Sequence, residues 1–171
     1  TTMPTPDFPG NSFGQGKNVP AIAMAHGIPY VATATVADLH DLERKVRYAM
    51  SFHGARYIHI LVPCPLGWGA PSAKTIELAR LAHETGLFPV FEAEYGEVTN
   101  VSKIRRKQPV EKYLMLQKRF AHLFGKKGNP EIVQRMQALA DRNIARYGLL
   151  GDEQGDDIPV PEQAEERHHV I

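Results

Sequence analysis

The stretch of sequence that decides the fold runs from residue 28 to residue 63 and reads IPYVATATVADLHDLERKVRYAMSFHGARYIHILVP. It begins with a β-branched run, continues with a segment whose apolar residues recur every three or four positions, and ends with a second apolar run. Asp38 can cap the N-terminus of the middle segment, and Gly54 can end it. The pattern predicts a strand, a helix and a second strand, which is the repeating unit of a parallel sheet with helices on its faces.

The same stretch indicates which sides of these elements are buried. One face of the predicted helix is apolar, and we expect it to pack against the sheet. That face consists of Leu39, Leu42, Val46 and Ala49. The strand that follows is apolar at consecutive positions from Ile60 to Val62, as expected of a strand that is covered on both faces.

The flanking sequence continues this alternation. Upstream, Asn18 can cap a short helix that stops at Gly27. Downstream, Ser72 can cap a helix that stops at Gly86, and an apolar strand over residues 87–95 follows. The sequence therefore predicts an α/β fold with a mostly parallel sheet flanked by helices.

After residue 98 the sequence changes in character. A basic link leads into two amphipathic segments over residues 110–124 and 130–150, which predict a helical hairpin. The remainder is acidic and interrupted by prolines, as in a segment that is disordered or held by a partner. We thus expect three parts: an α/β domain over residues 1–100, a helical extension over 101–150 and a tail over 151–171.

Composition excludes several classes of protein. A formal charge of +1 over 171 residues argues against a generally basic nucleic-acid-binding protein. A single cysteine cannot form an internal disulfide, so a reducing cytoplasm is the expected location. We find no apolar run of about 18 residues and no signal-peptide pattern, and expect neither a membrane span nor secretion. Residues 1–17 resemble a loop entered midway, without an initiator methionine, so we expect the chain to be a fragment.

The single cysteine, Cys64, is the first candidate for chemistry. It follows an apolar strand, has a proline on each side and is followed by Gly67 and Gly69. Free cysteines are often small buried hydrophobes, and that interpretation stays open. The context also suits a metal ligand, because backbone amides can donate to sulfur and glycines let the backbone approach an inorganic group.

Other polar residues are weaker candidates. Glu92, Glu94 and Glu97 belong to a strand that runs into a glycine, and we interpret them as solvent-facing or paired charges without acid–base roles. Basic residues 105–107 form either a surface charge run, which we favour, or a docking patch for an acidic partner. The eight histidines form no metal-binding spacing, and residues 168–169 are expected to be solvated.

Four segments together resemble a known family. They are GKNVPAIAMAHGIPYVATATV, YIHILVPCPLGWG, IELARLAHETGLFPVFE and QPVEKYLMLQKRFAHL, in this order between residue 16 and about residue 150. The chain resembles the C-terminal half of the thiamine-diphosphate-binding β subunit of pyruvate synthase and other 2-oxoacid:ferredoxin oxidoreductases. The proline-bracketed cysteine and the HGIPYVATA segment are the most specific parts of the likeness.

The resemblance implies an activity and a role for the cysteine. Enzymes of this family oxidatively decarboxylate a 2-oxoacid with coenzyme A, using thiamine diphosphate and Mg²⁺, and pass electrons through 4Fe-4S clusters to ferredoxin. In the family, the position that matches Cys64 is the last ligand of the cluster nearest to thiamine. The expected partners are therefore other subunits of such a complex, coenzyme A, and ferredoxin or another electron acceptor.

The sequence also departs from the family pattern. The G-D-G-D segment, the asparagine motif for Mg²⁺ and diphosphate, and three cluster cysteines are absent. The resemblance thus implies one cluster ligand here, and no catalytic residue can be assigned. Pyruvate is the first expected substrate, with phenylglyoxylate, oxalate and 2-oxoglutarate as alternatives. A hypothesis of another class is a non-catalytic α/β interaction subunit whose helical hairpin docks a partner and whose Cys64 is buried.

Overall fold

The structure, a computed structural model, describes residues 17–126 and 128–151. The expected N-terminal loop and acidic tail therefore lie almost entirely outside the described residues. The elements are α1 (Val19–Ala25), β1 (Tyr30–Thr35), α2 (Leu39–Ala49), β2 (Arg56–Leu61), α3 (Pro65–Trp68), η2 (Ser72–Lys74), α4 (Thr75–Glu84), β3 (Phe91–Glu94), β4 (Glu97–Val101), α5 (Val110–Met115), η3 (Lys118–Leu123) and α6 (Pro130–Tyr147). The predicted α/β class is confirmed.

The four strands form one sheet in the order β2-β1-β3-β4. β1 pairs with β2 in parallel, whereas β1 with β3 and β3 with β4 are antiparallel. The expectation of a mostly parallel sheet is therefore corrected to a mixed sheet. The reason is the position of α4, which packs beside α5 and ends near the carboxyl end of β1, as its residues Arg80 and His83 share a hollow with Thr35. β3 enters the sheet from that end and so runs against β1.

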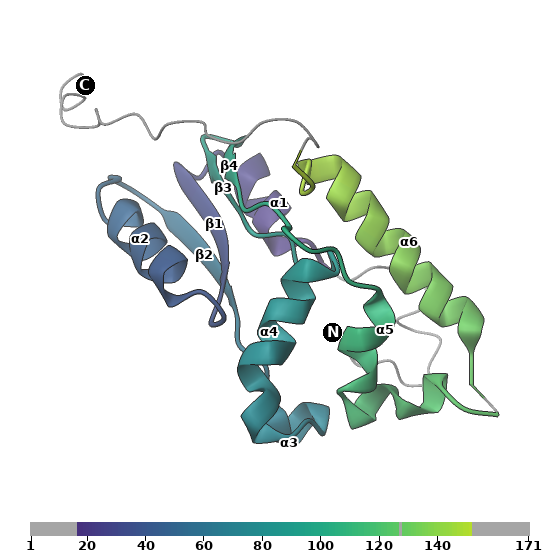
Figure 1. Cartoon of the computed structure of the whole chain (residues 1–171). Helices are drawn as coiled ribbons and strands as arrows, with labels where there is room; N and C mark the ends of the chain where they lie inside the picture. The colour runs from purple at the N-terminus through teal and green to yellow at the C-terminus, as the bar shows by residue number, and fades with distance from the viewer. Residues whose placement is uncertain (1–16, 127, 152–171) are drawn as a thin grey trace.

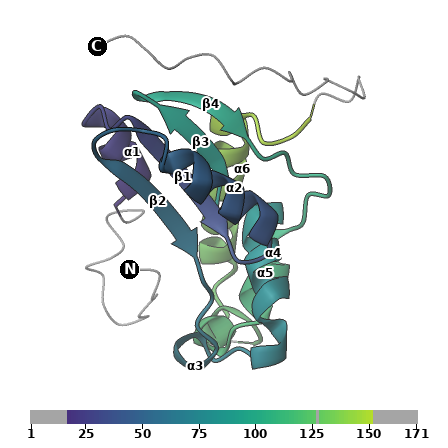
Figure 2. The same cartoon turned by 90° about the vertical axis from the view of Figure 1, so that its left-hand side faces the viewer.

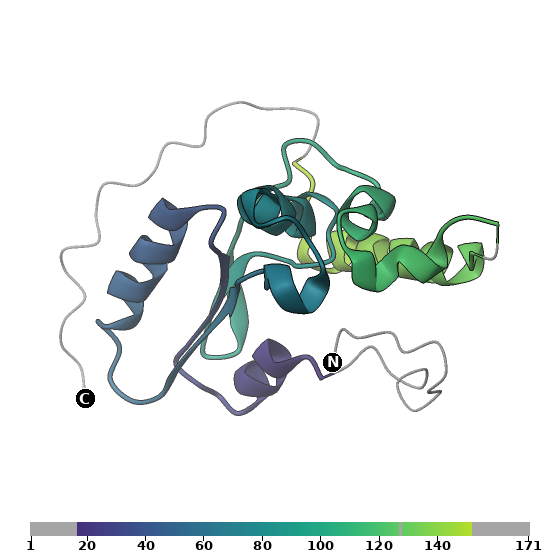
Figure 3. The same ribbon diagram turned by 90° about the horizontal axis from the view of Figure 1, so that it is seen from below.

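Helices cover the two faces of the sheet, as Figures 1 and 3 show. α2 lies on one face, where Ala49 and Phe52 pack against Tyr30, Ala32 and Ile58. α1 and α6 lie on the other face, where Ala23 and Tyr147 belong to one apolar cluster with Val31, Phe91 and Ala93 of the sheet. β1 is the centre of this arrangement, because all six of its residues are buried.

A second core lies beyond the carboxyl end of β1 and β2. It brings together α4, α5, η3 and α6 around Leu78, Leu114 and Phe120, and Trp68 packs against its border. The predicted helical hairpin is only partly formed, because its first helix ends at Met115 and gives way to the 3₁₀ turn η3. Gln117 explains the break: it is extended, and its buried side-chain amide donates to the carbonyl of Tyr113, 2.7 Å away.

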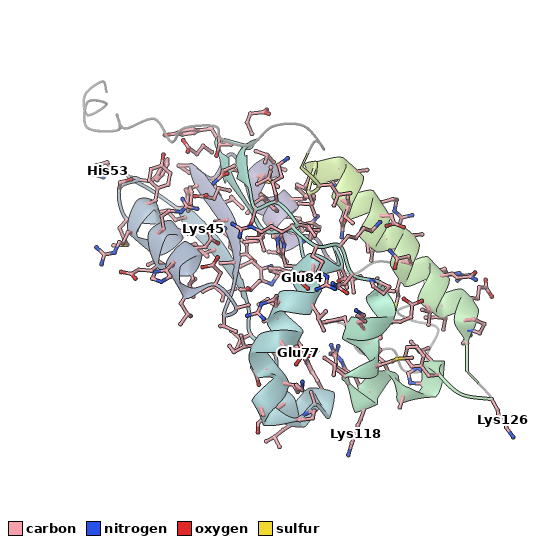
Figure 4. All side chains as sticks on the ribbon, viewed as in Figure 1. Lys45, His53, Glu77, Glu84, Lys118 and Lys126 are labelled. Atoms are coloured by element: carbon pink, nitrogen blue, oxygen red, sulfur yellow. The ribbon has the colours of Figure 1, made fainter. Side chains whose placement is uncertain are left out.

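One prediction of burial holds only at Ala49 of α2, and a second is wrong. The side of α2 that faces the sheet carries Lys45 and Ala49, whereas Leu39 and Val46 are 65% and 42% exposed. Figure 4 shows Lys45 on the sheet side of its helix. The β2 strand is an edge strand, and its apolar residue Ile60 is 40% exposed instead of being covered.

The local helix signals are confirmed in part. Asn18 and Asp38 cap α1 and α2, each accepting a hydrogen bond from a backbone amide three residues later. α2 ends at Ala49, before the predicted stop at Gly54. Ser72 begins the 3₁₀ turn η2 instead of capping α4, whose first residue has no side-chain cap before it.

Gly86 joins the sheet to the second core at a point without room for a side chain. Its φ is +80°, and a Cβ there would lie 2.6 Å from Cγ1 of Ile144 and 2.9 Å from the carbonyl oxygen of Ala140, both in α6. Gly27 also has a positive φ, +66°, but a Cβ there would meet nothing within 4 Å. A substitution at Gly27 therefore introduces backbone strain alone, whereas one at Gly86 introduces both backbone strain and steric overlap.

We predict that Gly86→Ala destabilises the chain more than Gly27→Ala does. Both variants carry the left-handed strain of about 1–2 kcal/mol. Gly86→Ala adds overlap with α6, which costs about 1–3 kcal/mol more. Urea denaturation of the two variants measures the difference, and equal free energies of unfolding would contradict the close packing of α6 on this turn.

Candidate functional site

Cys64 lies where the parallel pair of strands ends. β2 leads directly into the turn that holds it, and α3 follows, as Figure 2 shows. In α/β sheets, ligands bind beyond the carboxyl ends of the parallel strands. The Cys64 side chain is exposed, so the expectation of a buried small hydrophobe is wrong for this structure.

The backbone around Cys64 forms a short helical turn. Cys64 is the N-terminal cap of α3, and its Sγ accepts a hydrogen bond from the Gly67 amide at 3.4 Å. Pro65 occupies the first helical position, and Gly69 ends the turn with φ +65°. A Cβ on Gly67 would lie 3.3 Å from Sγ, so the missing side chain keeps the sulfur accessible. These observations agree with the expected donation from the Gly67 amide.

The chemistry of this turn fits one metal ligand. A backbone amide directed at the sulfur is one of the contacts that tune cluster thiolates. Among residues 17–126 and 128–151, no group of three or more His, Cys, Asp or Glu side chains could hold a metal ion. The described part of the chain can therefore contribute one ligand to a cluster but cannot hold one unaided.

Two residues that the sequence did not single out secure this turn. The guanidinium carbon of Arg119 lies 4.1 Å from the centre of the Trp68 ring, a cation–π geometry. The amide of Lys118 donates to the carbonyl of Gly69 at 3.2 Å. No spacing rule connects positions about 50 residues apart, and both residues lie at the start of η3, after the end of α5.

Both carboxylates of β3, Glu92 and Glu94, are paired with neighbouring side chains. Glu92 is 3% exposed and accepts hydrogen bonds from Arg44, Tyr30 and Asn100 at 2.6–3.1, 2.7 and 2.8 Å. It is thus a paired charge, as one of the expected alternatives had it, but not a solvent-facing one. Glu94 accepts from the Tyr48 hydroxyl at 3.0 Å.

The electrostatics of Glu92 keep it ionised. Burial raises the pKa of this carboxyl, but hydrogen bonds from Arg44, Tyr30 and Asn100 and the charge of Arg44 outweigh it, so the pKa is lowered overall. Burial and the bond to Glu92 in turn raise the pKa of Tyr30, which stays a donor. The group has no open position for a substrate and serves to join α2 to the sheet.

The basic residues after β4 do not form one patch. Lys107 pairs with Asp141 of α6 at 2.8 Å. Arg105 and Arg106 are exposed, and Arg106 lines an open groove of about 510 Å³ between α4 and α5, together with both acidic and basic residues. The surface-charge interpretation holds for Lys107.

A smaller hollow of about 160 Å³ lies at the carboxyl end of β1. Asp38, Arg80 and His83 are among its polar lining residues. Burial lowers the pKa of His83, while hydrogen bonds with the backbone of Lys103 and Phe88 oppose the effect. Residues 168–169, the histidine pair of the tail, lie outside the described residues. None of the described helices has the length and apolar character needed to cross a membrane.

Comparison with known proteins gives the family likeness. No family model matches the chain. A pyruvate synthase subunit PorB from Methanosarcina barkeri is 50% identical over 133 residues, which is 78% of this chain and 45% of that subunit. The predicted resemblance to pyruvate synthase is confirmed.

Further relatives broaden the comparison. PorB of Pyrococcus furiosus is 36% identical over 181 aligned positions, covering 95% of this chain and 52% of that subunit. The ketoisovalerate oxidoreductase subunit VorB of Pyrococcus abyssi is 42% identical over 121 residues, covering 70% of this chain and 38% of that subunit. The chain is therefore similar to oxidoreductase subunits, and it spans about half the length of the curated relatives it matches.

We predict that Glu92→Gln costs about 2–3 kcal/mol of stability at neutral pH, because it leaves buried donors with a weaker acceptor. The Glu92 pKa is lowered on folding, so its contribution is present above the unfolded-state value of about 4.3 and is lost as the pH falls through the lower folded value. Urea denaturation at pH 7 and pH 3 measures the difference from the native chain.

The matched control is Glu97→Gln, which removes a carboxylate from an exposed position of β4. Its effect should stay near zero at both pH values. A stability gap for Glu92→Gln that does not narrow in acid would contradict the ionised pairing with Arg44.

Proposed function

We propose that this chain is part of a 2-oxoacid oxidoreductase that decarboxylates a 2-oxoacid with coenzyme A and passes the electrons through 4Fe-4S clusters to ferredoxin. Identity of 50% to a PorB subunit over most of this chain carries the proposal and makes pyruvate the first substrate. The likeness to VorB favours a branched-chain 2-oxoacid as second candidate. The same proposal places the enzyme in the cytoplasm, since one cysteine gives no disulfide.

Within this enzyme, Cys64 would supply one thiolate to a 4Fe-4S cluster. Such clusters take four cysteine ligands and supply one-electron transfer when bound. The exposed sulfur, the amide of Gly67 directed at it and the position at the end of β2 support this role. The remaining ligands, and the groups that bind thiamine diphosphate and Mg²⁺, would come from other segments or chains.

The free edge of the sheet supports assembly with further polypeptide. Arg44 and Tyr48 place one flank of α2 over β3, through Glu92 and Glu94. The opposite flank of α2 lies toward the β2 side of the sheet, where the outer edge of β2 pairs with no strand among the described residues. Exposed Leu39, Val46, Met50, Ile60 and Val62 form this surface, which we call the β2-edge surface. Exposed apolar patches of this kind mark interfaces.

We predict that Cys64→Ser removes one cluster from the assembled enzyme, or about four iron atoms per subunit. Iron and acid-labile sulfide analysis, together with low-temperature EPR of the reduced enzyme, measures the loss. Ser72→Ala, which removes a hydroxyl from the next turn, serves as the control and should retain all iron. Unchanged iron in Cys64→Ser would exclude ligation by this cysteine and favour a non-catalytic interaction subunit.

We also predict that Ile60→Lys disrupts assembly. A buried unpaired charge in the β2-edge surface should reduce co-purification of the other subunits by about tenfold or more. Val98→Lys is the matched control, because Val98 is 41% exposed on the opposite edge of the sheet, in β4. Equal yields for the two variants would show that the β2-edge surface is not the interface.

A further inference from the structure

The turn that presents Cys64 has little to hold it in place by itself. None of the four residues of α3 is buried, and Leu66 at its centre is 96% exposed. Its internal bonds run from the Trp68 amide to the Cys64 carbonyl at 3.0 Å and from the Ala70 amide to the Pro65 carbonyl at 2.9 Å. An isolated turn of this length is unstable in water, so its orientation must be set by contacts with the rest of the chain.

Those contacts come from the first residues of η3. The Arg119 guanidinium lies against Trp68, with 4.1 Å from its carbon to the ring centre, and against Phe120 at 4.6 Å. The Lys118 amide donates to the Gly69 carbonyl, and Cβ of Lys118 lies so close to Gly69 that a side chain there would approach it to 2.7 Å. Figure 4 shows Lys118 at the end of the molecule where α3 and η3 lie.

Arg119 is itself fixed from the opposite side. Its Nε donates to the side-chain oxygen of Gln117 at 2.8 Å, and Gln117 is 1% exposed and anchored to the Tyr113 carbonyl. A chain of contacts therefore runs from the second core through Gln117 and Arg119 to Trp68, four residues from Cys64. The planar guanidinium can make both contacts at once, because its face stacks on the Trp68 ring while its edge donates a hydrogen bond to Gln117.

We propose that Arg119 is a positioning residue for Cys64: by stacking on Trp68 it fixes the turn that directs the sulfur outward from the end of β2. The functional importance of the Arg119–Trp68 contact rests on the proposed role of Cys64 as a cluster ligand. Its effect on the direction and mobility of the sulfur does not depend on iron. The two claims can therefore be tested separately.

The first experiment uses the full chain without iron. Cys64 is its only cysteine and Trp68 its only tryptophan, so a nitroxide label and indole fluorescence each report on this turn alone. Arg119→Lys retains the positive charge without the planar stack, and Arg119→Gln loses both. We expect the mobile fraction of the label to increase about 2- to 30-fold in both variants, the range set by the strength of the cation–π contact. Far-UV circular dichroism confirms that each variant is folded.

Three further variants test whether the change in label mobility is specific to the contact between Arg119 and Trp68. Arg142→Gln, at an exposed position of α6, should leave the label and the fluorescence unchanged. Trp68→Phe keeps a ring for the guanidinium and should give a smaller increase in label mobility than Trp68→Ala. A label that stays immobile in the folded Arg119→Lys chain, although the Trp68 fluorescence has changed, would overturn the proposal.

The second experiment uses the assembled enzyme. We expect Arg119→Lys to lose iron to a chelator about 2- to 30-fold faster than the native enzyme, and the EPR signal of the reduced cluster to change. Iron loss at the native rate with a mobile label would overturn the functional part of the proposal. If Cys64→Ser retains all iron, the proposed ligation fails, and the label mobility still decides whether Arg119 positions the turn.

Discussion

The buried carboxylate of Glu92 holds together the two parts of the mixed sheet. Its donors come from different elements: Tyr30 from β1, Arg44 from α2 and Asn100 from β4. The parallel part of the sheet, formed by β1, α2 and β2, is thereby tied to the antiparallel hairpin of β3 and β4. Because Arg44 reaches across from the helix, the same ion pair fixes the rotation of α2 about its axis. Removing one partner of such a pair leaves a buried charge or donor uncompensated, so the pair constrains the geometry around Glu92.

The rotation of α2 explains where reasoning from sequence succeeds and where it fails. The helix itself, its cap at Asp38 and the flanking strands follow from local patterns and are found as expected. The buried side of α2 follows from these patterns only at Ala49, because a periodic pattern assumes that all apolar residues face the core of the same chain. Here Lys45 is buried instead, with its ammonium donating to the Thr33 carbonyl and pairing with Asp41. No local pattern distinguishes a lysine of this kind from a solvated one.

The direction of β3 and the break after α5 were also beyond sequence patterns. Alternating strands and helices favour parallel pairing, but direction depends on where the connecting helix ends in space. The break depends on Gln117, whose side chain replaces a backbone hydrogen bond of the helix. Within the candidate site, the glycines and prolines around Cys64 are visible in the sequence, and the Gly67 amide donates to the sulfur as that pattern allows. The stacking of Arg119 on Trp68 is a tertiary contact between segments about 50 residues apart, so no local sequence pattern predicts it.

β2 adjoins both the exposed sulfur of Cys64 and the β2-edge surface. Its carboxyl end leads into Cys64, and its outer edge, which pairs with no other strand in the described part of the chain, lies on the same side of β1 as the exposed apolar residues of α2. A strand added to that edge in the direction of β2 would end next to Cys64, because neighbouring parallel strands end at the same side of a sheet. Residues that follow such a strand would then lie within reach of the sulfur. The geometry thus provides a way for one pairing event both to cover the β2-edge surface and to bring further side chains next to Cys64, as the proposed role of this cysteine in a shared cluster would require.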